Sequence, residues 1–241
     1  MTVALILLGG VYGVLFWSPT FRIDQPIVTG TERTDPTDIQ AAVAPLLDKM
    51  RWLILPNRAL LAAPSGELAE AAQSVSGSIE SVTVKKELPN VLKLEVQERE
   101  PLAIWSAAGD FFFVDERGIT YDHIERGESR DVSLPVIVDE RSSATVEGDR
   151  VTTEESLRFV STIYAELTRG GGIGVNFFVA PSRLAPDLIL VTSEGWKVFF
   201  DTTTDAHTQV LTLQTVLKEQ VKDRRNLDYV DLRVPGRVFV K

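Results

Sequence analysis

The sequence predicts a mixed α+β protein with an N-terminal transmembrane helix, a small β-α-α-β-β module and a sheet-rich domain that carries two helices. Three observations predict this class. Residues 2–17 carry no charge and are almost all apolar. Val91–Glu98 alternates apolar and polar residues, the period of a strand with one buried face. Many short strand-like segments follow Pro101. The predicted boundaries are 1–20 for the helix, 21–98 for the module and 99–241 for the sheet-rich domain.

The composition narrows the classes of function. The chain has 241 residues and a formal net charge of -9. Its basic residues are scattered singly, so it lacks the basic patch that holds a phosphate backbone, and we expect no nucleic acid partner. It contains no cysteine and 2 histidines. This leaves no disulfide framework, no thiolate metal site and no cysteine nucleophile, and we expect neither a metal nor a cofactor.

The apolar N-terminal segment has the length of a membrane anchor. A helix from Met1 to Phe21 would be about 31 Å long, close to the ~30 Å hydrocarbon core of a bilayer. Trp17 suits the headgroup zone, and Pro19 ends the helix. A cleaved signal peptide is the alternative, but no small-residue cleavage site follows the segment. The orientation stays open, because the nearest basic residue, Arg22, lies on the far side of the segment.

Residues 21–98 contain the elements of a small α+β module. Phe21–Gly30 has the pattern of a strand that ends in a turn. Asp35 can cap a helix that has Pro36 at its first position, and Pro45 should kink or shorten this helix. A second short helix is predicted at Ser65–Val75. The module closes with a hairpin whose strands are Ile79–Glu87 and Val91–Glu98.

The third part combines short strands with two helices. The first helix should be opened by a capping box of Thr152 and Glu155, and the second runs from about Asp205 to Asp223. The glycine-rich Arg169–Gly174 follows a helix and lacks the Lys-Ser/Thr of a phosphate loop, which favours a helix stop and a turn. The predicted strands are Leu102–Ala107, Phe111–Asp115, Leu134–Val138, Val175–Val179, Leu188–Thr192 and Trp196–Phe200.

The residues of the usual catalytic sites do not occur together in this sequence. His123 and His207 lie far apart, and neither belongs to an HExxH, GxSxG or SxxK arrangement. Two acidic pairs have structural positions: Glu154–Glu155 opens a helix, and Asp110 with Asp115 brackets a strand. We therefore predict no enzymatic activity and no small-molecule substrate. A membrane-tethered enzyme with an unrecognised site is kept as an alternative.

Several segments spread over the chain point to one family. They are Phe21–Gly30, the stretch Glu80–Trp105, Val114–Asp122, Leu134–Val138 and Tyr229–Lys241. Within the second segment, an ER-x-P-x-A-x-W pattern is formed by Glu98, Arg99, Pro101, Ala103 and Trp105. In this order, the segments resemble the FtsQ/DivIB family of bacterial cell division proteins.

The resemblance implies a scaffold protein of the divisome that acts in septation. It implies a single-pass protein of the cell (inner) membrane, with the bulk of the chain on the periplasmic or extracytoplasmic side. Residues 21–98 would form a POTRA domain and residues 99–241 an FtsQ-type β domain. The implied partners are an FtsB/FtsL-like pair, with FtsK and FtsW/FtsI-like proteins as further partners. The rival class is a POTRA-containing protein of envelope assembly or secretion, which would need a barrel of long alternating strands that this chain lacks.

The C-terminus is the predicted partner-binding site. Asp228–Val234 and Arg237–Lys241 have the pattern of strands joined by a turn at Pro235–Gly236. We expect the last strand at a sheet edge, where unpaired N–H and C=O groups can accept a strand of another chain. The resemblance implies that the FtsB/FtsL-like pair docks there. For the side chains of Val238 and Val240, closure of the sheet's own core remains an equal alternative. The predicted site residues are Arg233, Val234, Gly236, Arg237, Val238, Phe239 and Val240.

Overall fold

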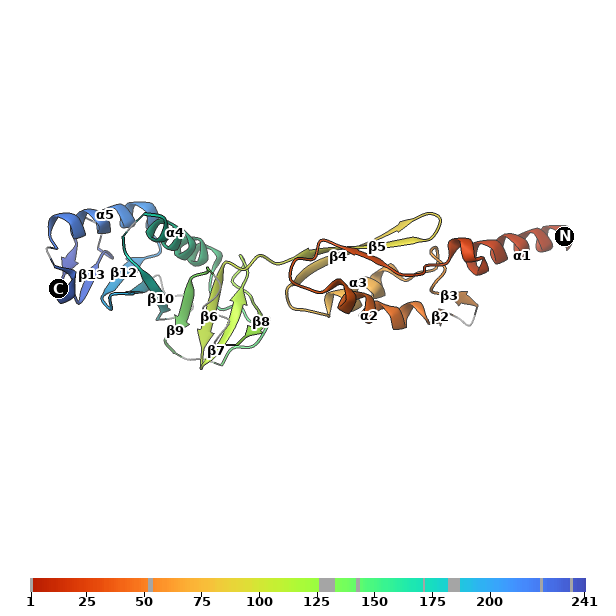
Figure 1. Ribbon diagram of the computed structural model, residues 1–241, viewed down its shortest axis with the longest axis horizontal. Helices are drawn as coiled ribbons and strands as arrows, with labels where there is room; N and C mark the ends of the chain where they lie inside the picture. Colours follow the sequence, from red (N-terminus) through yellow and green to blue (C-terminus); the bar gives the residue numbers. More distant parts are fainter. Residues whose placement is uncertain are drawn as a thin grey trace. The chain divides into compact units, whose positions relative to one another are not determined.

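The chain folds into two compact units, which Figure 1 shows in a computed structural model. The units are Met1–Arg99 and Glu100–Lys241, and each has its own hydrophobic core. The five α-helices and three sheets of the described residues confirm the predicted mixed α+β class. The structure describes residues 2–51, 54–125, 133–141, 144–170, 172–181, 187–221, 223–234 and 236–241.

The first unit begins with the apolar helix α1, Thr2–Trp17. It ends there because Ser18 opens a 3-10 turn, Pro19–Phe21, and accepts a hydrogen bond from the N–H of Thr20 with its side chain. With 16 residues, α1 is about 24 Å long. Among the described residues, no helix combines the length and the apolar character needed to cross a membrane. The transmembrane helix predicted for residues 1–20 is therefore not supported.

A three-stranded sheet with two helices forms the rest of the first unit (Figure 1). The strand order is β1-β5-β4, with β1 parallel and β4 antiparallel to β5. As the alternation predicted, Leu92, Leu94 and Val96 are buried, and they pack with Ile39 and Leu68 of the helices. The elements are β1 Ile27–Thr29, α2 Pro36–Leu47, β2 Met50–Arg51, β3 Leu55–Pro56, α3 Ser65–Gln73, β4 Ile79–Glu87 and β5 Val91–Glu98.

The bounds of β4 and β5 are as predicted, and the cap of α2 is confirmed, since the Asp35 carboxylate accepts the N–H of Thr37. The prediction of a strand over Phe21–Gly30 is mostly wrong. Only β1 forms there, because the chain first makes the 3-10 turn, and Arg22 has only an isolated bridge to Ala59. The short β2–β3 hairpin has no counterpart in the prediction.

The turn after β1 is fixed by a glycine and a carboxylate. Gly30 has a φ of +88°, and a Cβ at this position would lie 2.2 Å from the carbonyl oxygen of Val96. Only glycine fits there. The Glu98 carboxylate then accepts three successive N–H groups, of residues 32–34, at 3.1, 3.0 and 2.9 Å. Partial burial raises the pKa of Glu98, but these hydrogen bonds outweigh it and hold the pKa below its ordinary value.

The second unit is a nine-stranded sheet in the order β14-β13-β12-β11-β10-β9-β6-β7-β8. Helix α4, Glu154–Gly170, connects the parallel strands β9 and β10, and α5, Ala206–Glu219, connects β12 and β13. Both helices lie along one face of the sheet (Figure 1) and bury the core there. The strands are β6 Ala103–Ala107, β7 Asp110–Val114, β8 Thr120–Ile124, β9 Val136–Asp139, β10 Val175–Ala180, β11 Asp187–Thr192, β12 Lys197–Asp201, β13 Tyr229–Asp231 and β14 Phe239–Val240.

The six strands predicted for residues 102–200 all occur, with ends shifted by at most two residues. The predicted capping box of α4 is wrong by one position. The Thr153 hydroxyl oxygen accepts the N–H of Ser156 at 3.2 Å, whereas Thr152 is buried. Helix α4 ends at Gly170, in agreement with the glycine stop. Residue 171 of the predicted turn lies outside the described residues.

Candidate partner-binding edge

The C-terminal strands form one end of the nine-stranded sheet. β13 pairs with β12, and β14 pairs only with β13 among the described strands. Both strands are shorter than the predicted ranges, Asp228–Val234 and Arg237–Lys241. β13 ends at Asp231 because its carboxylate accepts the N–H of Arg233 at 3.0 Å, and that N–H is then lost to the ladder.

The main chain of Val240 faces away from β13. Tyr229 and Lys241 exchange two hydrogen bonds, one in each direction, both of 3.1 Å. In an antiparallel ladder, such bonded pairs alternate with pairs whose N–H and C=O groups point outward. Val240 forms the next pair, with Val230, and so belongs to the second kind. Its N–H and C=O groups therefore point to the open edge of the sheet.

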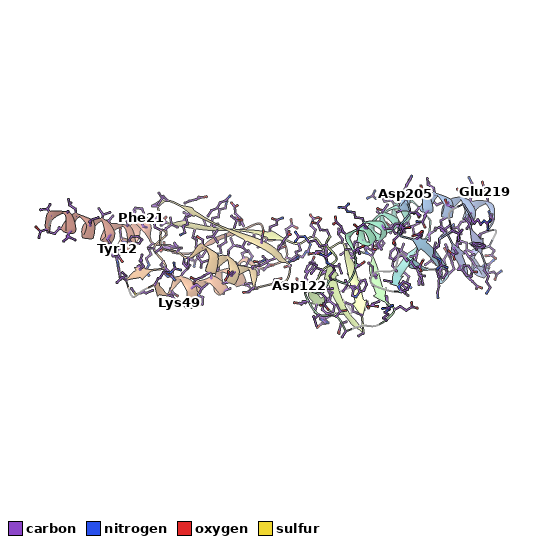
Figure 2. All side chains as sticks on the ribbon, turned by 180° about the vertical axis from the view of Figure 1, so that it is seen from behind. Tyr12, Phe21, Lys49, Asp122, Asp205 and Glu219 are labelled. Atoms are coloured by element: carbon purple, nitrogen blue, oxygen red, sulfur yellow. The ribbon has the colours of Figure 1, made fainter. Side chains whose placement is uncertain are left out.

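The side chains of this edge on the helix side of the sheet line a hollow beside α5. Val240 lies opposite the buried Val230, so Val240 and Val238 belong to this side. Val238 packs against the core, while Val240 remains 39% exposed. The hollow has a volume of about 370 Å³. Its lining residues are Thr204, Asp205, Thr208, Gln209, Thr212, Leu232, Val234, Gly236, Arg237 and Val238. Asp205, which caps α5, is labelled in Figure 2.

The opposite side of the same edge carries an aromatic residue and a fixed positive charge. Phe239 is 50% exposed and is paired with Asp231. The Asp231 carboxylate binds the Arg233 guanidinium at 2.7 Å, and this hydrogen bond holds the pKa of Asp231 below its ordinary value. Arg233 also lies 4.9 Å above the centre of the Phe199 ring and 3.7 Å from Asp187. These contacts hold the guanidinium close to β14.

The other end of the sheet, at β8, is covered by its own chain. The N–H of Thr120 donates to the carbonyl of Asp149 at 3.0 Å, and the N–H of Gly148 donates back to Thr120 at 2.8 Å. The N–H of His123 donates to the Glu147 carboxylate at 3.1 Å. These bonds occupy outward-facing groups of β8, whereas no such cover lies over β14 in the described part of the chain.

All seven predicted site residues are described, and the structure brings them to this one edge. Val234, Gly236, Arg237 and Val238 line the hollow, Phe239 and Val240 form β14, and Arg233 lies on the opposite side. Pro235 of the predicted turn lies outside the described residues. The contribution of α5 is not evident from the sequence alone. Its signal is the pair Thr208 and Thr212, four residues apart and so on one line of the helix, with Thr204 just before the capping Asp205.

Residues with possible acid/base or metal chemistry have structural roles. The Asp115 carboxylate accepts the N–H groups of Arg117 and Ile119 at 3.0 and 2.9 Å, which closes the turn between β7 and β8. His207 binds the Glu166 carboxylate at 2.8 Å and so joins α5 to α4. In the ranges that the structure describes, no group of three or more His, Cys, Asp and Glu side chains is placed to hold a metal ion.

Comparison with known proteins gives three relatives, all named cell division protein FtsQ. The chain is 32% identical to the protein of Streptomyces bingchenggensis over 121 residues, 49% of this chain and 42% of the relative. It is 25% identical to that of Mycobacteroides abscessus over 112 residues, 46% of this chain and 33% of the relative. It is 22% identical to that of Corynebacterium glutamicum over 223 residues, 89% and 87% of the two chains.

The matches to the first two relatives span less than half of those proteins' length. No protein-family model matches the chain. The resemblance to the FtsQ/DivIB family that the sequence segments predicted is confirmed by the three relatives.

Proposed function

We propose that this chain is a membrane-anchored scaffold protein of the bacterial divisome that binds partner proteins by strand addition at β14. The similarity to three proteins named cell division protein FtsQ supports a role in cell division. The single observation that supports the binding mode is the outward direction of the Val240 main chain, at a sheet edge that no described segment of the chain covers. An unpaired N–H and C=O pair on an edge strand is a template for a further strand.

The two sides of the edge define the partner strand. A strand that pairs with β14 would alternate its side chains between the hollow beside α5 and the side that carries Phe239. The lining of Val234 and Val238 with the threonines of α5 fits medium-sized apolar side chains. Next to Phe239, the guanidinium of Arg233 favours an acidic residue. An alternating strand with one acidic position is thus the expected ligand.

The resemblance implies that this strand belongs to an FtsB/FtsL-like pair. Within the first unit, residues 21–98 would act as a POTRA domain. Its two sheet edges, β1 and β4, are then the surfaces for FtsK and for FtsW/FtsI-like proteins. Lys85 and Glu87 are exposed on β4, and charged side chains discourage pairing at an edge. Of the two, β1 is therefore the more accessible edge.

Anchoring is proposed for α1. All sixteen residues are uncharged, and none of them is buried by the rest of the first unit. Uncharged apolar side chains in water are unfavourable by about 25 cal/mol per Å² of exposed apolar area, so a bilayer is the environment that stabilises this helix. In the proposed arrangement, both folded units lie on the extracytoplasmic side of the cell membrane.

Cross-linking in growing cells tests the site. A photoreactive amino acid is placed at Arg237 or at Phe239, in a strain whose own copy of the protein is depleted. We expect each variant to restore division and to form an adduct with the FtsB/FtsL-like partner. The matched control is the same amino acid at Glu125, an exposed residue next to β8 at the covered end of the sheet, where no adduct is expected. Restored division without adducts at Arg237 and Phe239 would contradict the site.

A further inference from the structure

The end of α1 and the β2–β3 hairpin form one exposed apolar surface. Trp17 is the last residue of α1 and is 57% exposed. Met50 in β2 and Ile54 before β3 are 48% and 56% exposed. Trp17 and Met50 line the same hollow together with Phe16 and Pro56. We call Trp17, Lys49, Met50, Arg51 and Ile54 the hairpin surface.

The hairpin lies alongside the last turns of α1, not beyond them. The Tyr12 hydroxyl donates a hydrogen bond to the carbonyl of Ile54. Tyr12 is five residues before the end of the helix, so Ile54 lies beside a point about 7.5 Å back along the axis. Figure 1 shows β3 next to the C-terminal part of α1, and Figure 2 labels Tyr12 and Lys49 in this region. A plane drawn across the axis of α1 at the level of its last turns therefore passes through the hairpin as well.

The hairpin surface is positive in a chain that is negative overall. Between positions 48 and 58, Lys49, Arg51 and Arg58 face one acidic residue, Asp48, whereas the whole chain has a net charge of -9. Arg58 is paired with Asp48 at 2.7 Å, and Arg51 reaches Glu67 at 2.8 Å. With both acidic partners counted, three basic and two acidic side chains leave one net positive charge, that of Lys49, in a chain that is negative overall.

We infer that the hairpin surface binds an anionic lipid surface and lies at the level of the headgroups. Exposed apolar side chains flanked by basic ones are the combination that binds to a membrane interface. The occupant follows from continuity with α1. This helix of sixteen uncharged residues, none of which is buried, is the proposed bilayer anchor, and Ile54 is hydrogen-bonded to it. This inference rests on the anchoring role proposed for α1. Its consequence is that the first unit is held against the membrane at two points.

A single fluorophore on the full chain tests this inference. Because the sequence contains no cysteine, Ile54→Cys gives one labelling site on an exposed side chain. The protein is reconstituted into vesicles of phosphatidylcholine and phosphatidylglycerol. We expect an environment-sensitive dye at position 54 to shift to shorter wavelength, to lose several-fold of its quenching by aqueous iodide, and to be quenched by nitroxide-labelled lipids. Vesicles of phosphatidylcholine alone should weaken all three effects.

Two further labels separate the possible outcomes. Asp38→Cys lies in the first turn of α2, about 14 Å along that helix from its end at Leu47, which precedes the hairpin, and its dye should remain accessible to iodide. Leu8→Cys in α1 reports on the anchor itself. A dye at position 54 that iodide quenches as strongly as at position 38 overturns the inference. If the dye at position 8 is shielded from iodide in that sample, α1 is anchored in the bilayer but the hairpin surface does not bind the lipid. Protection at position 54 without quenching by the lipid nitroxide points to a protein or a second copy as the cover, and also overturns it.

Discussion

The guanidinium of Arg233 lies 4.9 Å above the centre of the Phe199 ring, and it binds the Asp231 carboxylate at 2.7 Å. The ring and the carboxylate come from two neighbouring strands, β12 and β13, that pair at this position. Arg233 therefore ties β13 to β12 on the side of the sheet away from the helices. The positive charge beside β14 is held in place before any partner arrives.

Replacement of Arg233 by alanine should separate its two roles. The side chain is 39% exposed, so water screens the ion pair, and the pair and the cation-π contact together stabilise the fold by about 1 kcal/mol at most. We expect Arg233→Ala to lower the free energy of unfolding by no more than this, and to weaken partner binding by about tenfold through loss of a charge contact. Arg233→Lys keeps the charge and serves as the control. Urea unfolding and partner titration measure the two effects, and equal binding by wild type and Arg233→Ala would exclude the charge contact.

Substitution of Gly30 should strongly destabilise the first unit. Alanine there would need a φ of +88°, and its Cβ would lie only 2.2 Å from the Val96 carbonyl oxygen. Because that oxygen belongs to the backbone of a paired strand, it cannot move aside without a large energetic cost. We expect Gly30→Ala to lower the free energy of unfolding by about 2 kcal/mol or more. The matched control is Gly66→Ala in α3, where a Cβ would meet nothing within 4 Å. That variant should be neutral or slightly stabilising, because alanine favours a helix more than glycine does.

The stability that Glu98 contributes to the turn after β1 should depend on pH. Its pKa is lowered in the folded chain, so its contribution to stability is present above the ordinary carboxyl value of about 4.3 and is lost as the pH falls through the folded value. Glu98→Gln keeps one acceptor oxygen and replaces the other with an NH₂ group that faces N–H donors. Hydrogen exchange at the amides of residues 32–34 should become faster in this variant at neutral pH, and in the wild type only in acid. Unchanged protection of these amides in Glu98→Gln would show that the carboxylate does not hold the turn.

The elements that the sequence predicts well are those with a local physical cause. The bounds of β4 and β5 follow from strict alternation, and the start of α2 follows from Asp35 and Pro36. Other features depend on contacts between distant segments. Thr152 and Thr153 are equally suited to cap α4, and the choice falls on Thr153 because the backbone of Thr152 lies against Gly118. β8 contains Asp122 with a φ of 42°, and the paired β7 has an irregular register at Phe112/Phe113, so β8 lacks a regular strand pattern.

The candidate site also has parts that the sequence predicts and parts that depend on contacts between distant segments. The residues of the C-terminal ribbon and the turn character of Gly236 can be predicted from the sequence alone. The lining of the hollow cannot, since the threonines of α5 and Val234 meet only after the α5 crossover has placed β13 beside β12. The direction of the Val240 main chain also depends on the register between β13 and β14. A shift of this register by one residue would turn the N–H and C=O groups of Val240 toward β13.

The most direct test of strand addition removes one hydrogen-bond donor. In Val240→Pro, the N–H that points to the open edge is lost, while the bonds between Tyr229 and Lys241 are kept. Val240→Ala shortens the same side chain and keeps the N–H. Full-length wild type, Val240→Pro and Val240→Ala are titrated with the purified FtsB/FtsL-like pair, and hydrogen exchange at Tyr229 and Lys241 checks that the ribbon is intact. We expect a loss of affinity of about tenfold or more for Val240→Pro and of at most about threefold for Val240→Ala. Wild-type affinity in Val240→Pro with an intact ribbon would contradict strand addition at β14.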